Sequence, residues 1–374
     1  MANILTNKFS VLSSSVQCNS AHKAELLWLI PLAIMFLILT ITAEVLSQIN
    51  GTSAMMMVGS YSWKALRFFP AMLAFGVIVQ VILAVARNHR TAADDIVIQW
   101  RSWLSSPYLM AARLIPIFVM PFFFSSFSVL KMLIPRYVPF WLDEPLSKID
   151  KLMFFGYQPW ELTHAIFTSL ESMIIFDLLY AYWVLLLSVS ICGFSLFAPR
   201  QDRARFFLAF GGAWFFLGFI GAWVGSSAGP CFLAFLGLPG AQEYAVLIDN
   251  LRSANISTGG RVNAPFWQET LAQAYLSKQY YFGMGISAMP SLHNAIAILY
   301  AFAAFRIGKL IGWFMTAYAV IIFIGSIHLG WHYAADGIVA AAGMWAIWHA
   351  ANWWCVASGY DMSVMADNET KEQR

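Results

Sequence analysis

Long apolar runs separated by short polar stretches dominate the chain. Eight of these runs approach the roughly 20 residues that an α-helix needs to cross the hydrocarbon core of a bilayer. The runs lie at residues 26–46, 66–85, 108–130, 173–197, 206–225, 290–305, 310–329 and 333–354. We therefore predict an all-α integral membrane protein with about eight transmembrane helices. The connection 136–168 is predicted as loop with an interfacial helix, and the longest connection, 226–287, as a loop that covers one end of the bundle.

Composition excludes an ordinary soluble protein. The 374 residues are 60% hydrophobic and only 11% charged, whereas soluble domains carry roughly 25% charged residues. The 16 tryptophans fit side chains at membrane interfaces. A net charge of +3, spread along the chain, leaves no basic block suited to nucleic acid.

Cysteine usage and the first residues indicate neither a disulfide framework nor a signal peptide. Cys18, Cys192, Cys231 and Cys355 show no CxxC spacing and no paired pattern, so we predict no disulfide framework and no zinc site. The first 22 residues are polar and lack an early apolar stretch, which is not the pattern of a signal peptide.

Basic residues orient the predicted helices. The short connections after the second, fourth and sixth helices are basic and should be cytoplasmic. Their cations are Arg87, Arg90, Arg101, Arg200, Arg203, Arg205, Arg306 and Lys309. An even number of helices then places both termini on the cytoplasmic side. The connections 131–168 and 226–288 and the turn 329–333 should face the opposite side, either periplasm or an organelle lumen.

The first candidate for chemistry is the sequence AMPSLH at residues 288–293. Pro290 suits the first position of a helix and Ser287 could cap it. Backbone N–H groups at such an end form a natural phosphate cradle, and His293 could donate a proton to a bound group. The alternative is a plain helix cap with an interfacial histidine.

The second candidate is the stretch from His328 to Asp336. His332 and Asp336 are four residues apart, so on a helix they share one face. Asp336 could accept a hydrogen bond from one ring nitrogen of His332, which leaves the other nitrogen free to attack. An acidic residue inside a spanning helix is a functional hypothesis by default. The alternative is a structural His–Asp pair that joins helices.

The third candidate is the pair of cations Lys131 and Arg136, just outside the third helix. Such cations could bind phosphate oxygens. The alternative is interfacial snorkelling, which is common at helix ends. Under a topology derived from other residues, all three candidates fall on the same side of the membrane.

Together these residues resemble a known family. The sequence PSLH at 290–293, followed about forty residues later by His332-x-x-x-Asp336, resembles the type 2 phosphatidic acid phosphatase superfamily, most closely its inositol phosphorylceramide synthase-like branch. The turn at Gly229-Pro230 and the stretch 131–160, with Asp143, Asp150 and Gly156, also resemble that branch. The resemblance covers roughly residues 108–350.

The resemblance implies a six-helix core, no metal or other cofactor, and a covalent phosphohistidine intermediate. By position, His332 would be the nucleophile, Asp336 its partner, and His293 the group that protonates the leaving oxygen, while Ser291 would help to hold the phosphate. The phosphatase-type Ser-Arg pair upstream of the nucleophile is replaced by Gly325 and Ser326. Its role as a phosphate clamp could pass to Lys131, Arg136 or His328, and its loss favours the transferase-like branch.

We therefore predict three regions: an N-terminal region with two extra transmembrane helices at 1–105, a catalytic six-helix membrane domain at 106–356, and a cytoplasmic tail at 357–374. The expected activity is that of a lipid phosphatase or phosphotransferase. Its substrate would be a phospholipid or a polyprenyl- or sphingolipid-type phosphate, and its acceptor water or a lipid or sugar alcohol. The alternatives are a polytopic transporter or a non-catalytic lipid-binding membrane protein.

Overall fold

The computed structural model describes residues 26–88, 106–278 and 283–358, together with the five positions 94, 97, 100, 101 and 104. These residues form helices and turns without a β-strand, which confirms the all-α prediction. Predictions about the first 25 residues and about the tail from residue 359 onward lie outside the described residues.

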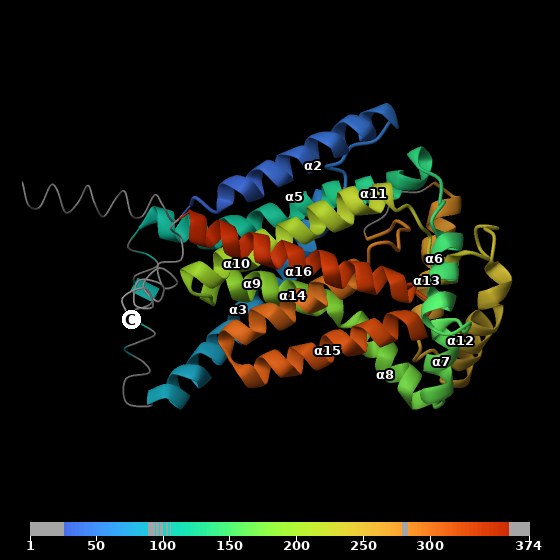
Figure 1. The fold of residues 1–374 in the computed structure, drawn as a ribbon. Helices are drawn as coiled ribbons and strands as arrows, with labels where there is room; N and C mark the ends of the chain where they lie inside the picture. Colours follow the sequence, from blue (N-terminus) through green and yellow to red (C-terminus); the bar gives the residue numbers. More distant parts are fainter. Residues whose placement is uncertain are drawn as a thin grey trace, which may run out of the picture.

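Long helices run side by side along the body of the molecule (Figure 1). They are α2 (Leu29–Ile49), α3 (Val58–Asn88), α5 (Pro107–Tyr137), α8 (Leu170–Ala181), α9 (Trp183–Phe197), α10 (Arg200–Gly212), η1 (Ala213–Gly221), α11 (Ala222–Val224), α14 (Leu292–Ile307), α15 (Lys309–His328) and α16 (Ala334–Ala357). Helices α8 and α9 form one apolar stretch, as do α10, the π-helical η1 and α11. Every predicted apolar run is therefore helical.

Five helical stretches are long and apolar enough to cross a membrane: Leu29–Ile49, Pro107–Tyr137, Leu170–Phe197, Arg200–Val224 and Lys309–His328. A sixth is reached if the bent pair Val58–Arg67 and Phe69–Ile82 counts as one span. The protein is thus a multi-pass membrane protein. The number eight stays a prediction, because α14 has only 16 residues and α16 contains Asp336, His349 and Asn352.

Shorter helices gather at one end of the bundle (Figure 1). They are α6 (Asp143–Met153), α7 (Pro159–Ile166), α12 (Ala245–Ser257) and α13 (Ala264–Leu276), together with the short turns η2 (Pro230–Phe232) and η3 (Ala241–Tyr244). The connection 136–168, predicted as loop with an interfacial helix, contains the two helices α6 and α7. The connection 226–287, predicted as loop, instead contains α12 and α13.

Close packing between η1 and α14 positions the first turn of α14, which carries His293. A side chain at Gly218 would come within 2.7 Å of the Leu292 side chain and 2.9 Å of Phe127. Glycine at position 218 therefore leaves room for the Leu292 and Phe127 side chains to pack against η1.

Candidate functional site

His332 and Asp336 lie at the start of α16 and are hydrogen-bonded to each other. The His332 Nδ1 atom is 3.2 Å from Asp336 Oδ2, and the two side chains are 8% and 0% exposed. The helix begins only at Ala334, so the expected placement of both residues on one helical face is wrong. Instead Asp336 folds back over the helix start and also accepts the Tyr333 N–H at 3.1 Å.

His293 lies in the first turn of α14, as predicted, but the cap differs. Helix α14 begins at Leu292, and Ser291 caps it by accepting from the Asn294 N–H at 3.4 Å. The expected cap at Ser287 and start at Pro290 are therefore wrong, because Ser291 is extended and its own N–H donates to the Asp336 carbonyl at 3.4 Å.

Aromatic side chains hold the His293 ring. The ring stacks on Tyr180 at 4.4 Å and packs against Trp183 at 4.2 Å between centroids. Trp331 stacks in turn on Tyr180 at 6.0 Å. The ring centroids of His293 and His332 are 6.2 Å apart, so the two histidines of the separate motifs meet. The sequence analysis did not predict these aromatic contacts. Their only signal in the sequence was the presence of Tyr180 and Trp183 in the apolar run 173–197.

Asp150 on α6 holds the start of α16. Its carboxylate accepts the N–H groups of Ala334 at 2.7 Å and Ala335 at 2.9 Å. Burial raises the pKa of Asp150 to about 6, although these two hydrogen bonds act in the opposite direction. Asp150 thus positions the segment that carries His332 without belonging to the histidine pair.

Asp143, at the start of α6, joins two other segments. It accepts the N–H groups of Ala228 and Gly229 and, at 3.0 Å, the hydroxyl of Tyr333. Burial raises the pKa of Asp143, and the same backbone hydrogen bonds oppose the rise. The sequence suggested Asp143 and Asp150 only through family resemblance and gave neither a role.

The turn 226–229 connects both histidine motifs. The Ser227 carbonyl accepts the Ala288 N–H at 3.0 Å, and the Ser227 hydroxyl accepts the Met289 N–H at 3.0 Å. Gly229 has φ +98°, and a Cβ there would lie 2.7 Å from the Trp331 carbonyl oxygen. This close approach requires glycine, which explains why the Gly229-Pro230 turn accompanies the motifs.

The two predicted cations lie at the end of α5 but have different surroundings. Lys131 is close enough to His293 to interact with it electrostatically. Within the described residues, Lys131 has no hydrogen-bond or ion-pair partner. Arg136 donates to Asn50 Oδ1 at 3.0 Å, across the bundle end toward α2.

His328 belongs to a separate group of side chains. Its ring is fully buried and packs against His164 at 4.2 Å between centroids, while its Nδ1 atom is 3.3 Å from the Thr163 hydroxyl. His164 Nε2 is 2.9 Å from the His328 carbonyl oxygen. These contacts attach α7 to the end of α15.

Comparison with known proteins agrees with this geometry. A model of the PAP2 superfamily matches residues 144–350, more than half of the 374-residue chain and including both histidine motifs. No curated protein and no solved structure matches the chain. The length of the family match shows that this chain belongs to the PAP2 superfamily, whose members are generally phosphatases or phosphotransferases.

Proposed function

We propose that the protein transfers the phosphoryl group of a lipid-linked phosphate through a covalent intermediate on His332. The observation that supports this most directly is the 3.2 Å contact between His332 Nδ1 and Asp336. A carboxylate can only accept, so Nδ1 carries the proton and the lone pair of Nε2 remains for attack. Asp336 also stabilises the positive charge that the ring acquires.

The reaction then has two steps. In the first, His332 Nε2 attacks phosphorus, a P–N bond forms, and the P–O bond to the leaving group breaks while His293 protonates the departing oxygen. In the second, water or an alcohol attacks phosphorus, His293 accepts its proton, and the P–N bond breaks. The 6.2 Å between ring centroids lets one phosphate contact both rings, and stacking on Tyr180 fixes the angle of His293.

Lys131 is our candidate for the cation that holds the phosphate, because it interacts with His293 and lacks another partner among the described residues. The resemblance gave Ser291 a role in holding the phosphate. We assign it a smaller part in that role, because its hydroxyl already accepts from the Asn294 side chain at 3.0 Å. His328 contacts α7 and acts in this proposal through that packing. Arg136 lies farther along the end of α5.

One position in the site supports a phosphotransferase over a phosphatase. Ser326 stands where the phosphatase-type motif has its arginine, and its buried hydroxyl donates to the Phe323 carbonyl at 2.8 Å. A lipid phosphate is therefore held without that clamp, as in the inositol phosphorylceramide synthase-like branch. We place the site on the non-cytoplasmic side from the distribution of basic residues.

The decisive experiment incubates detergent-purified protein with lipid phosphates and phospholipids, with and without lipid alcohols, and follows all products by mass spectrometry. His332→Ala and His349→Ala run in parallel, because His349 is an exposed histidine on the same helix. We expect His332→Ala to lower turnover by at least about 10³-fold and His349→Ala to leave it unchanged. A phosphorylated protein that is labile to acid and stable to base should form only when His332 is present.

The products distinguish the candidate functions. Free phosphate with dephosphorylated lipid identifies a phosphatase, and a new phosphorylated lipid that needs an acceptor identifies a phosphotransferase. Turnover that survives His332→Ala rules out the phosphohistidine. Substrate that crosses the bilayer unchanged in both variants indicates the transporter alternative.

A further inference from the structure

A cluster of buried polar side chains joins the two histidine motifs inside the protein. Asn294 follows His293 in the first turn of α14, and Ser326 lies in the last turn of α15. The Asn294 Nδ2 atom donates to the Ser326 hydroxyl at 3.3 Å and to the Ser291 hydroxyl at 3.0 Å. The three side chains of this cluster are between 0% and 2% exposed. Asn294 therefore connects α14 to α15 directly beside His293.

The backbone of Ser326 in turn holds His332. The Ser326 carbonyl accepts the N–H of Trp331 at 2.9 Å and that of His332 at 3.1 Å. Gly330, just after α15, has φ +74°, and its N–H donates to the Ile327 carbonyl at 3.0 Å. The bonds from Trp331 and Gly330 are those of a Schellman motif, a common helix end with a defined geometry. The position of Ser326 thus determines where the His332 backbone lies.

The Asn294 amide is costly for the stability of the fold. Its Oδ1 atom is buried and has no hydrogen-bond partner among the described residues. An unsatisfied buried acceptor is destabilising, whereas an apolar side chain of the same shape carries no such cost. Stability alone would therefore favour leucine at position 294, and what leucine lacks is the Nδ2 donor that binds Ser326.

We propose that Asn294 is a positioning residue that sets the spacing of His293 and His332. The inference rests on the proposed phosphoryl transfer, in which one phosphate contacts both rings. Asn294 directly follows His293. Because Ser326 holds the backbone of His332, its hydrogen bond with Asn294 joins the two histidines through the protein interior. A displacement of reacting groups by about 1 Å can slow a reaction about 10²-fold, so one buried hydrogen bond at this place matters for the transfer.

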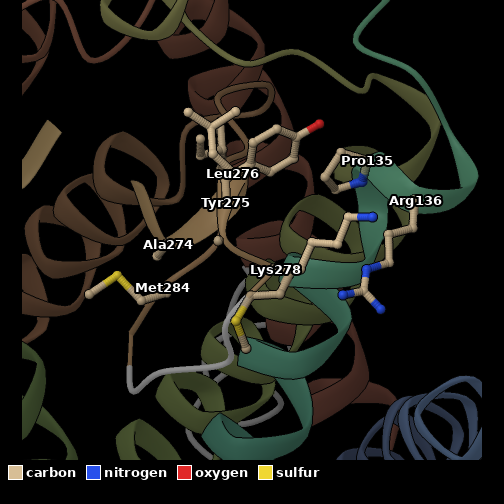
Figure 2. A pocket seen from close by; sticks show the side chains of 10 residues that line it. Pro135, Arg136, Ala274, Tyr275, Leu276, Lys278 and Met284 are labelled. Atoms are coloured by element: carbon tan, nitrogen blue, oxygen red, sulfur yellow. The ribbon is translucent and has the colours of Figure 1, made fainter. Parts of the chain in front are cut away.

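The cluster is separate from the open pocket at the end of α5. That pocket has a volume of about 310 Å³ and lies between the last turn of α5 and the segment that follows α13 (Figure 2). Ser291, Asn294 and Ser326 are not among its lining residues. Substitutions at these three positions therefore leave the side chains of the pocket wall unchanged, and we attribute their effect on anion binding to the histidine site.

The experiment measures equilibrium binding of orthovanadate to the detergent-purified full chain by isothermal titration calorimetry. Orthovanadate takes up the five-coordinate geometry of phosphoryl transfer, and such an analogue binds tightly only where the reacting groups are correctly spaced. The variants are Ser326→Ala, the double variant, and Asn294→Leu, which keeps the shape of the side chain without its hydrogen bonds. Ser126→Ala is the matched control, because Ser126 is a buried helical serine that donates to its own helix, at the Phe122 carbonyl, at 3.0 Å. His332→Ala identifies the binding that belongs to the histidine site.

We expect Asn294→Leu and Ser326→Ala each to weaken vanadate binding about tenfold, and Ser126→Ala to leave it unchanged. The double variant should bind no more weakly than Asn294→Leu alone, because both substitutions remove the same hydrogen bond. The melting temperature of Asn294→Leu should stay the same or rise, whereas a purely structural role of the amide requires it to fall.

Three results overturn this inference alone: unchanged affinity in Ser326→Ala, additive losses in the double variant, or a lower melting temperature that accompanies each loss of binding. Vanadate binding that is absent from the wild type, or that survives His332→Ala, overturns the proposed phosphohistidine and this inference with it.

Discussion

Two carboxylates outside the histidine pair hold the segment that carries His332. Asp150 accepts two N–H groups at the start of α16, and Asp143 joins Tyr333 to the turn at Gly229. Neither is placed to touch a substrate in the proposed mechanism, so both are positioning residues. Their substitution should affect the geometry of His332 rather than remove a reacting group.

Asp150 makes the stability of the protein depend on pH. Its pKa of about 6 in the folded protein lies above the value of roughly 3.9 in an unfolded chain. The folded protein thus binds this proton more tightly, which contributes stability that is fully present below about pH 4 and lost as the pH rises through about 6. The full contribution is about 3 kcal/mol. We expect the melting temperature in detergent to fall more between pH 5 and 7.5 for the wild type than for Asp150→Asn; parallel curves would contradict this.

Gly229 should tolerate no side chain. Gly229→Ala would bring a Cβ within 2.7 Å of the Trp331 carbonyl oxygen at φ +98°. We expect it to destabilise the protein by about 2–3 kcal/mol and to lower kcat by displacing the segment before His332. Gly259→Ala is the matched control, because Gly259 has φ +65° with nothing within 4 Å of the added Cβ. Similar losses in thermal unfolding for both variants would show that the contact with Trp331 is unimportant.

Among the helices, α6 differs in direction from the candidate spans. It lies across the end of the bundle rather than along it (Figure 1). Asp143 and Asp150 face the protein interior, whereas the exposed surface of α6 has a charged part with Glu144 and an apolar part with Leu152, which is 83% exposed. Phe155, just after the helix, is 94% exposed. A helix at a bundle end whose exposed surface is divided into charged and apolar parts is typical of an interfacial helix.

We therefore expect Phe155 to dip into the bilayer. A polarity-sensitive dye on Phe155→Cys, in a Cys18→Ser background, should be quenched by brominated lipids in nanodiscs. The same dye on Glu144→Cys, on the charged part of the exposed surface of α6, should not be quenched. The cysteines at 192, 231 and 355 are buried and should not react. Equal quenching at both positions would argue against an interfacial α6.

The elements show what a sequence can and cannot predict. Every long apolar run is helical because hydrophobic length alone specifies such helices. Helices α12 and α13 were predicted as loop, because short helices of mixed polarity at a bundle end lack that signal. The motif histidines were found from their spacing, and the structure brings them together. The partners Asp150 and Asp143 lie 184 and 190 residues from Ala334 and Tyr333, a separation over which no local pattern carries information.

In the whole molecule, α2 and α3 form the part predicted as an addition to a six-helix core. Trp28, just before α2, is fully buried and stacks on Phe207 at 5.6 Å, and Ser125 on α5 donates to the Ala54 carbonyl. The hydrogen bonds that hold the histidine pair nevertheless come from residues 143–336 of the described chain.

We therefore expect a chain of residues 106–356, which lacks α2 and α3, to insert into the membrane and to keep a turnover within about tenfold of the full chain. In it, the surfaces of α5 and α10 that contact the missing helices would contact lipid of similar apolarity instead. Its melting temperature should fall, since the Trp28 and Ser125 contacts are lost. Circular dichroism and turnover in the same detergent check both. A folded but inactive truncated chain would show that the N-terminal helices belong to the catalytic unit.

The anchoring of α16 by α6 also has a consequence for synthesis. Asp150 leaves the ribosome 184 residues before Ala334, whose N–H it accepts, and Asp143 leaves it 190 residues before the Tyr333 hydroxyl that donates to it. Until α16 is in place, water at the membrane surface must solvate the Asp150 carboxylate. In the proposed mechanism the nucleophile His332 arrives with α16, the last helix among the described residues. We therefore expect a nascent chain to stay inactive while its other helices assemble, and a chain released before α16 to be inert toward the surrounding lipids.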